Sequence, residues 1–468
     1  MVRASVVAEK LGLPSVSIVC NGFVLQAGLT AAGLGMPNLP LSAYPGPASL
    51  HSLEEIQKNT RAVMIDQIIN GLTVQPKESK AGPSTEPEKK DIVFQGTFHE
   101  VNSFFYDNEW SEGLPVVPPT IETVEEFLKY TDRGADEIIG ALLPEKREAT
   151  VWSIAVNGAM SGCRPEYMPV LITIVEAMAD PKFGVEHLGH TPGTEVLIVI
   201  NGPIIKELGF NFEQGALRVG FQANTSIGRF WRLYLRNVAG FLPHKTDKAT
   251  FGGTWRVVLA ENEDALSQIG WNPLSVDQGF NAGDNVITIN SCTSTDSENG
   301  VAESIEGTDK VEAIFGKLSA RIVDIQLQLF ICRIVSPRIT PQILMSPCVA
   351  EALAQGGYSK DKVKQYLFEH AKFQASRFEA LWPLQGSISK AVEEGRLPKF
   401  YHESDDPNRL VPIVSSPDDF MIIVSGDPGK DNCLVCAQSG QRGYPTSKKI
   451  NLPVNWKELL GKAKELKS

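Results

Sequence analysis

The stretch PSVSIVC, residues 14–20, predicts a buried β-strand, because it is short, largely apolar and rich in β-branched side chains. The preceding residues, Ala4–Leu11, have the apolar spacing of the second half of an amphipathic helix. Phe23–Leu34 then predicts a helix of small residues, and Leu39–Tyr44 predicts a second strand. This order is typical of a Rossmann-like or flavodoxin-like fold whose first βα unit lacks its opening strand, so we expect a truncated α/β segment.

A long helix completes this segment. Ser52–Leu72 has helical apolar spacing, with Ser52 as a suitable N-cap and Glu55 three residues later, as in a capping box. Two parallel strands are too few to fold alone, so we expect residues 1–74 to dock on the rest of the chain or on a second protein chain. Residues 75–90 are charged and rich in proline, which predicts a flexible linker. Residues 91–468 then form a large mixed α/β domain.

The composition limits the possible partners. The chain has 468 residues, of which 42% are hydrophobic and 21% charged, and a formal net charge of -11. Because phosphate backbones are bound by basic surfaces, we expect no nucleic-acid partner. We also expect no membrane span, since no apolar run reaches about 18 residues. The seven cysteines are odd in number and stand in apolar contexts, which favours a reducing, cytoplasmic location.

Several elements are predicted within residues 91–468. Thr120 is a suitable N-cap for a helix from Ile121 to Tyr130. No repeat of fixed period is visible, which argues against solenoids and propellers. The other predicted helices are Glu166–Met178, Ser226–Val238 and a broken helix over Ala302–Val335, and the predicted strands are Glu195–Ile200, Trp255–Ala260, Asn285–Asn290 and Phe420–Val424.

Cys163 is the best-placed thiol for catalysis. It lies between two helical patterns, and Pro165 fits the first position of the second helix. A thiol before a helix N-terminus and beside Arg164 is expected to have a lowered pKa, because the helix dipole and the guanidinium both favour the thiolate. The alternative is structural: Gly162 and Cys163 form a small pair that allows close packing at a helix corner.

A second candidate site contains three arginines at helical spacing. Arg229, Arg232 and Arg236 follow a capped helix start, an arrangement that suits a carboxylate or a phosphate. Asn224 stands immediately before this helix start and offers an amide to the same ligand. A solvated or salt-bridged helix face is the alternative.

His370 and Glu166 are candidate general bases. His370 stands late on a predicted helix, and histidine titrates nearest to neutral pH. Glu166 follows Cys163 closely in the sequence, but spacing alone pairs it with no other group. A structural role for a lone helical histidine is the alternative.

Three further motifs favour structural interpretations. Residues 426–432, GDPGKDN, fail the pattern of a phosphate loop and indicate a tight turn between strands. Cys433 and Cys436 lie three apart on a predicted strand and should point to opposite faces. His187 and His190 could complete a zinc site with them only across a long separation in the chain. We expect no metal site.

Residues 5–72 resemble the body of the UGSC family, a group named for a selenocysteine-or-cysteine, Gly, Ser, Cys motif. The resemblance rests on Ile18-Val-Cys20, Phe23-Val24, Ala32-Gly-Leu-Gly-Met-Pro37 and Leu39-Pro-Leu41. In that family the motif follows the first strand and precedes the helix that corresponds to Ala4–Leu11. This sequence does not contain it.

The rest of the chain resembles large, poorly characterised proteins associated with that domain. The resemblance implies a two-part, thiol-linked enzyme in which the motif domain is joined to its partner through the linker. It implies no particular reaction. The shared patterns are Gly113-Leu-Pro-x-x-Pro-Pro-Thr120, Gly162-Cys-Arg-Pro-Glu-Tyr167, Asn201-Gly-Pro203, Asn224-x-x-Ile-Gly-Arg229 and Tyr366-Leu-x-Glu-His370.

Our leading hypothesis is a cytosolic, thiol-dependent enzyme of small-molecule metabolism, an oxidoreductase or a related enzyme, that acts on an anionic organic substrate. Cys163 is the expected nucleophile or redox thiol, His370 and Glu166 are the other expected catalytic residues, and Arg164, Asn224 and Arg229 are expected to bind the substrate. One alternative is a metal-independent lyase or hydrolase with a His or Glu base. Another is a non-catalytic homologue that acts as a binding or assembly subunit. The sequence specifies no cofactor.

Overall fold

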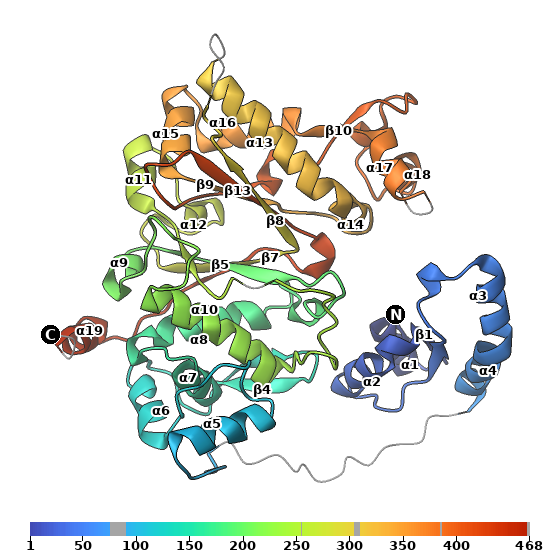
Figure 1. Cartoon of the computed structure of the whole chain (residues 1–468), viewed down its shortest axis with the longest axis horizontal. Helices are drawn as coiled ribbons and strands as arrows, with labels where there is room; N and C mark the ends of the chain where they lie inside the picture. Colours follow the sequence, from blue (N-terminus) through green and yellow to red (C-terminus); the bar gives the residue numbers. More distant parts are fainter. Residues whose placement is uncertain (75–89, 254, 304–308, 384–385, 466–468) are drawn as a thin grey trace.

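The computed structural model describes residues 1–74, 90–253, 255–303, 309–383 and 386–465. Its fold is mixed α/β, as predicted (Figure 1). The predicted linker, residues 75–90, falls outside the described residues except for Lys90, so the domain boundary that it marks stays a prediction.

The N-terminal segment contains a two-stranded parallel sheet, as predicted. Ser17 of the first strand pairs with Leu41 of the second. Ser52 caps the following helix through a capping box with Glu55. The elements are α1 (Val2–Lys10), β1 (Ser17–Cys20), α2 (Val24–Gly33), β2 (Leu41–Tyr44), α3 (Leu53–Asn59), a π-helical turn (Thr60–Met64) and α4 (Ile65–Thr73).

This segment contacts the larger unit through its first two helices. From α1, the Arg3 guanidinium donates a hydrogen bond to the Glu186 carbonyl oxygen at 3.1 Å. From α2, the Gln26 amide donates to the carbonyl oxygens of Gly189, at 3.1 Å, and Thr246, at 2.8 Å. The segment therefore docks on loops of the same chain.

Two four-stranded sheets form the centre of the larger unit. Each has one parallel pair at an edge, followed by two antiparallel pairings. In spatial order the first sheet contains β14 (Thr446–Lys449), β7 (Val286–Cys292), β5 (Glu195–Asn201) and β6 (Leu259–Ala260), and the second contains β12 (Met421–Val424), β9 (Gln342–Met345), β13 (Asn432–Ala437) and β8 (Ser294–Asn299).

The two sheets exchange their outer strands. β7 belongs to the first sheet, but the chain continues directly into β8 of the second. β13 belongs to the second sheet, and the chain then supplies β14 to the first. The described strands thus form two halves with the same pairing pattern. The edge strand of each half, β14 or β8, comes directly after the last strand of the other half in the chain.

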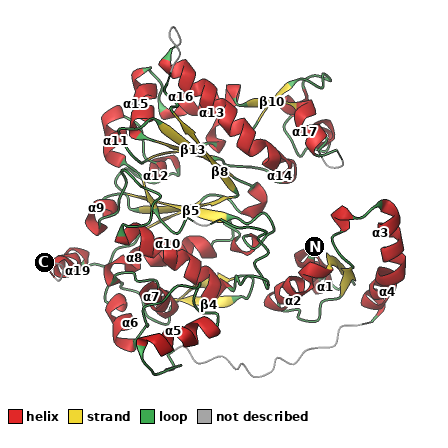
Figure 2. Ribbon diagram, viewed as in Figure 1, coloured by secondary structure: helices red, strands yellow, loops and turns green. Residues whose placement is uncertain are grey.

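The sheets and helices form four layers (Figures 1 and 2). Leu197 and Val199 of β5 pack with Leu344 of β9 and Ile423 of β12 in a core between the sheets. Alternate residues of β5, such as Ile198, pack instead against helices, because successive side chains of a strand point to opposite faces. A third core joins β9, β12 and β13 to the helices on the other side.

The helices on the outer face of the first sheet include α7 (Val151–Met160), α8 (Met168–Ala179) and α10 (Gln222–Tyr234), and those of the second include α13 (Lys310–Gln326), α15 (Pro347–Gln355) and α16 (Lys360–His370). The remaining helices are α5 (Phe98–Asp107), α6 (Ile121–Leu128), α9 (Ile204–Leu208), α11 (Glu263–Ile269), α12 (Leu274–Asp277), α14 (Phe330–Val335), α17 (Ala375–Leu381), α18 (Ile388–Glu393) and α19 (Trp456–Glu465). Two small antiparallel pairs complete the described strands: β3 (Ile138–Leu142) with β4 (Arg147–Thr150), and β10 (Lys372–Gln374) with β11 (Leu410–Pro412).

The ends of β6 and β12 meet where the two halves join. The carboxylate of Glu261 accepts hydrogen bonds from the backbone nitrogens of Val424, at 3.2 Å, and Leu274, at 2.7 Å. In the opposite direction the Ser425 hydroxyl donates to the Ala260 carbonyl oxygen at 2.8 Å. Glu261 is fully buried, and desolvation raises its pKa.

Most predicted elements of this unit are present. Thr120 caps α6, and the predicted long helix is broken into α13 and α14, although part of its range lies outside the described residues. The strand predicted over Trp255–Ala260 is wrong in extent, because only Leu259–Ala260 is a strand. The backbone of Val258 pairs instead with the backbone and side chain of Asn224 on α10. None of the described helices is long and apolar enough to cross a membrane.

Candidate anion-binding site

An arginine-rich cavity of about 170 Å³ lies beside the end of α10. Arg232 comes from α10, Arg236 from the π-helical turn that continues it, and Arg256 from the loop before β6. We call this cavity the arginine pocket. It is lined by Glu112, Leu188, Thr194, Arg232, Leu235, Arg236, Phe241, Pro243, Asp247 and Arg256.

The three guanidinium groups differ in their partners. Arg232 forms an ion pair of 3.3 Å with the buried carboxylate of Glu195. Arg236 donates to the carbonyl oxygen of Glu109, and burial lowers its pKa. Arg256 has no hydrogen bond or ion pair within the described residues. A guanidinium carries five donors, so Arg256 has capacity for an anion.

The backbone of Arg256 is held in an unusual conformation. Its φ is 49°, in the left-handed region that residues with a side chain rarely adopt. The adjoining backbone packs directly on Gly228 of α10, where a Cβ would stand 2.5 Å from the Cα of Val257. Only glycine leaves room for this approach. Gly228 therefore helps to position the Arg256 loop against the helix that carries Arg232.

The N-terminal segment docks at the rim of this pocket. Gln26 bonds to Gly189 and Thr246, whose chain neighbours Leu188 and Asp247 line the cavity. The pocket thus lies next to the contact between residues 1–74 and the larger unit.

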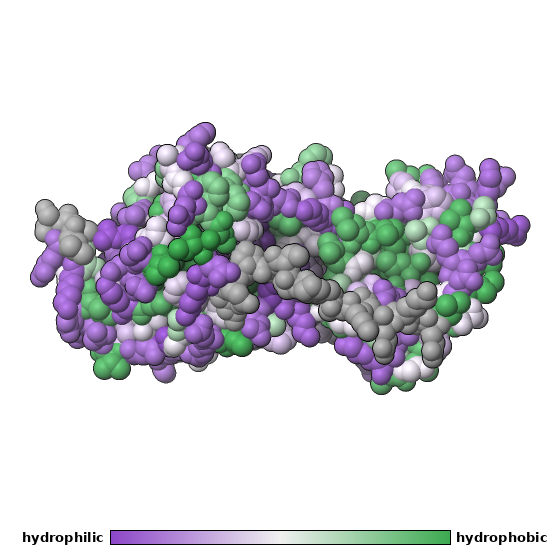
Figure 3. All heavy atoms as spheres, turned by 90° about the horizontal axis from the view of Figure 1, so that it is seen from below, coloured by the Kyte–Doolittle hydropathy of each residue, from purple (hydrophilic) through white to green (hydrophobic). Residues whose placement is uncertain are grey.

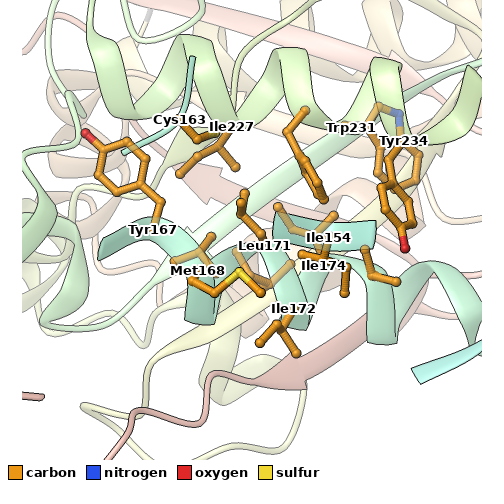
Figure 4. Packing of buried hydrophobic residues seen from close by; sticks show 14 of the residues in the cluster. Ile154, Cys163, Tyr167, Met168, Leu171, Ile172, Ile174, Ile227, Trp231 and Tyr234 are labelled. Atoms are coloured by element: carbon orange, nitrogen blue, oxygen red, sulfur yellow. The ribbon is translucent and has the colours of Figure 1, made fainter. Parts of the chain in front are cut away.

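Cys163 is buried beneath α10, beside Ile227 (Figure 4). It is 8% exposed, and desolvation raises its pKa to about 12. Hydrogen bonding to the hydroxyls of Ser161, at 3.3 Å, and Ser226 opposes this shift without cancelling it. The predicted lowering of the pKa is therefore wrong. Cys163 does precede a 3₁₀ turn, Pro165–Tyr167, that leads into α8, but burial of the thiol outweighs the groups that would favour the thiolate.

Arg164 and Glu166 are paired with each other. The Arg164 Nε donates to the Glu166 carboxylate at 2.6 Å, and Glu166 is 2% exposed. Arg164 also donates to the carbonyl oxygen of Ala463 in α19. The expected partnership of Arg164 with the Cys163 thiolate is not observed. Neither residue lines the arginine pocket.

The capped helix start predicted after Asn224 is wrong, because α10 begins at Gln222 without a side-chain cap and Asn224 lies inside it. Asn224 and Arg229 also use their polar groups within the fold. The Asn224 amide exchanges hydrogen bonds with the backbone of Asn211 and donates to Val258. Arg229 forms an ion pair of 2.6 Å with Glu112 and donates to the carbonyl oxygen of Pro115. Asn224 thus holds the loop at Asn211, and Arg229 holds the proline-rich stretch before α6. Both residues position backbone segments beside the pocket.

His370 lies in the other half of the molecule, at the end of α16. Its ring stacks on Tyr366 with centroids 3.8 Å apart. Cys163 belongs to the core beneath the first sheet, whereas α16 packs with the core of the second. The structure brings Cys163 near Ser226 and Arg229 on α10 but does not place His370 with them.

The remaining motifs are structural in this fold. Residues 426–431 connect β12 to β13 as a turn, as predicted. Cys433 packs with the outer core and Cys436 with the core between the sheets, which confirms that they face opposite ways. His187 contacts Arg3. Within the described residues no three His, Cys, Asp or Glu side chains group as metal ligands would.

Sequence patterns identified part of the pocket but not all of it. The spacing of Arg232 and Arg236 pointed to an anion site. No sequence pattern pointed to Arg256, because it lies in an irregular loop. Its position at the pocket depends on the packing of its backbone on Gly228.

Comparison with known proteins gives one match. Residues 1–74 match the model of the UGSC family. No curated protein and no solved structure matched the sequence. The chain therefore carries a UGSC-like domain at the N-terminus of a larger protein.

Proposed function

We propose that this protein is an enzyme of small-molecule metabolism that binds an anionic organic substrate in the arginine pocket. The observation that carries the proposal is Arg256, an arginine without a partner in the described residues that faces a cavity shared with two other arginines. Such a group binds a carboxylate or phosphate with a charge-assisted, bidentate geometry.

The size of the pocket narrows the substrate class. A cavity of about 170 Å³ is smaller than the roughly 300–1,000 Å³ typical of sites for drug-sized ligands. A small organic acid or phosphate suits it better than a nucleotide. The carboxylates of Glu112 and Asp247 stand on the same lining and would disfavour a ligand that is negatively charged over its whole surface.

Cys163 is not the proposed catalytic group, because a buried thiol with a raised pKa is a poor nucleophile. Cys20, at the end of β1, and Cys348 are the partly exposed thiols of the chain. If the reaction depends on a thiol, Cys20 is a better candidate than Cys163, because it belongs to the UGSC-like domain that docks at the pocket rim.

A binding titration tests this proposal. Succinate, citrate and inorganic phosphate are titrated into the full chain by calorimetry, with glucose as an uncharged control. Arg256→Ala should weaken binding of the preferred anion by about 10-fold or more, since a charge-assisted pair is lost. Arg218→Ala, at an exposed arginine that does not line the pocket, is the matched control. Equal anion affinity in R256A and the wild type would refute the proposal.

A second candidate function is assembly with another protein chain. Residues 1–74 expose many large apolar side chains, including Ile18 at 41% and Leu53 at 71%. Apolar surface is visible on this segment, at the right of Figure 3. Within the described residues β1 pairs with β2 alone. We propose that a partner chain adds a strand along the open edge of β1.

Sedimentation analysis tests the assembly. Ile18→Asp places a charge on β1 and should shift a complex towards the single chain. Val93→Asp, at a partly exposed apolar site in the larger unit, is the control. A wild type that sediments as a single chain, alone and in extracts of its source, would refute this second candidate.

A further inference from the structure

A second cavity, of about 420 Å³, lies between α13 and α16. It is distinct from the arginine pocket and belongs to the other half of the molecule. We call it the aromatic cavity. It is lined by Phe315, Gly316, Ser319, Ala320, Val323, Asp324, Tyr366, His370, Lys372 and Arg377.

Three rings form a continuous stack along one wall of this cavity. Phe315 and Tyr366 have centroids 3.9 Å apart at an angle of 18°, and Tyr366 and His370 have centroids 3.8 Å apart at 12°. His370 ends the stack and is exposed. The stack therefore offers a flat ring face on which a further planar group can lie.

Small residues of α13 leave part of the cavity lining open. A Cβ on Gly316 would meet no atom within 4 Å, and Ala320 follows one helical turn later. A larger side chain at Gly316 would extend into this open space. The helix surface thus accommodates a flat ligand against its backbone.

Two polar side chains of the cavity, Ser319 and Lys372, have no partner within the described residues, so a ligand could supply one. The Ser319 hydroxyl has no hydrogen-bond partner within the described residues, although Ser319 is only 8% exposed. Such a buried group normally has one. Lys372 makes no side-chain hydrogen bond or ion pair within the same residues, whereas Arg377 is paired with Asp324 at 3.3 Å.

His370 supplies an acceptor at the end of the stack. Its Nδ1 lies 2.9 Å from the carbonyl oxygen of Tyr366. Because a carbonyl only accepts, Nδ1 carries the proton, and in the neutral ring Nε2 is left as an acceptor. This arrangement fixes the ring orientation, and Nε2 has no hydrogen-bond partner within the described residues.

We propose that the aromatic cavity binds a planar aromatic ring that bears a negatively charged group, as in an aromatic carboxylate. The ring stacks on His370, the face of α13 at Gly316 and Ala320 supports it, and Lys372 pairs with the negative charge. The Ser319 hydroxyl, after rotation about its Cα–Cβ bond, donates to an acceptor atom of the ligand.

The position of the cavity in the fold agrees with this role. α10 lies between the parallel strands β5 and β6 in the chain, and α16 lies between the parallel strands β9 and β12. The arginine pocket lies at the end of α10, and the aromatic cavity lies at the end of α16. The linings differ: the aromatic cavity is formed mainly by α13 and α16, whereas the arginine pocket is formed by the end of α10 and by loops.

Benzoate and cyclohexanecarboxylate are the probes for this site. They have the same charge and similar size, but only benzoate is planar and aromatic. In calorimetric or saturation-transfer NMR titrations of the full chain, benzoate should bind about 3- to 10-fold more tightly, as expected for stacking. Equal affinities, or no benzoate binding up to about 10 mM, would overturn the proposal.

Two variants locate the binding. Gly316→Leu fills the cavity and should weaken benzoate binding by at least about 10-fold. The matched control Gly461→Leu, at an exposed glycine of α19 with no atom near its Cβ, should leave binding unchanged. Lys372→Gln should weaken benzoate binding and reduce its salt dependence. Benzoate binding that survives G316L but is lost in R256A would place the probe in the arginine pocket and overturn the proposal.

Discussion

Replacement of Gly228 by alanine tests how the arginine pocket is built. Gly228 lies in α10, and the backbone of Arg256 and Val257 passes directly over it. A methyl group there would stand 2.5 Å from the Cα of Val257, where an ordinary contact is at least 3.4 Å. The neighbouring atoms are backbone, so the whole loop must move by about 1 Å, and Arg256 must move with it.

The expected cost separates into two parts. Alanine favours a helix interior over glycine by about 1 kcal/mol, which stabilises the variant. Overpacking against a fixed backbone costs about 1–3 kcal/mol, which destabilises it. The variant Gly316→Ala in α13 should show only the stabilisation by alanine, because a Cβ at this position meets no atom within 4 Å. The difference between the two variants is therefore the packing strain at Gly228.

Thermal unfolding measures this difference. For a unit of this length the unfolding entropy is roughly 0.8 kcal/mol/K, so G228A should unfold about 1–4 °C below G316A. G228A should also bind the preferred anion more weakly, because Arg256 is displaced. Equal unfolding temperatures and equal anion affinity in the two variants would refute our account of how Gly228 positions Arg256.

Three further predictions follow from buried groups. In native protein at pH 8, mass spectrometry after iodoacetamide treatment should find Cys20 alkylated well before Cys163, whose pKa is raised to about 12. Arg229→Met should cost about 2–4 kcal/mol, because it leaves the Glu112 carboxylate largely buried without its partner, and the double variant with Glu112→Gln should recover part of this loss in chemical denaturation. Burial raises the pKa of Glu261, so the folded state binds the carboxyl proton more tightly than the unfolded state does. The contribution of Glu261 to stability should therefore fall as the pH rises from about 4.5 through the raised pKa. Glu261→Gln should remove that part of the pH dependence of the unfolding temperature.

Local features of this fold could be predicted from the sequence. The capping box at Ser52 and the cap at Thr120 depend on a few neighbouring residues, and both are present. The opposite orientation of Cys433 and Cys436 follows from the two-residue period of a strand, and it too is confirmed. Such features need no knowledge of distant contacts, which is why sequence patterns suffice for them.

The environment of Cys163 could not be predicted in this way. Its position before a helix suggested an accessible thiolate, but α10, some sixty residues later in the chain, covers it with Ile227. Asn224 and Arg229 were predicted to bind the substrate from their donor groups and from the helical spacing of the arginines. Their donors are of the correct type, and only the folded structure shows that loop carbonyls and Glu112 already occupy them.

The exchange of β8 and β14 explains why the repeated architecture is not visible as a sequence period. Each half takes one strand from the chain that follows the other half, so corresponding elements are not consecutive in the sequence. The exchange also means that neither sheet is complete without the other, and Glu261 and Ser425 add hydrogen bonds across the same junction. A ligand that stabilises one cavity therefore stabilises strands on which the second sheet depends. The two cavities differ in their linings, but the sheets that support them are joined through β8, β14 and the core between the sheets.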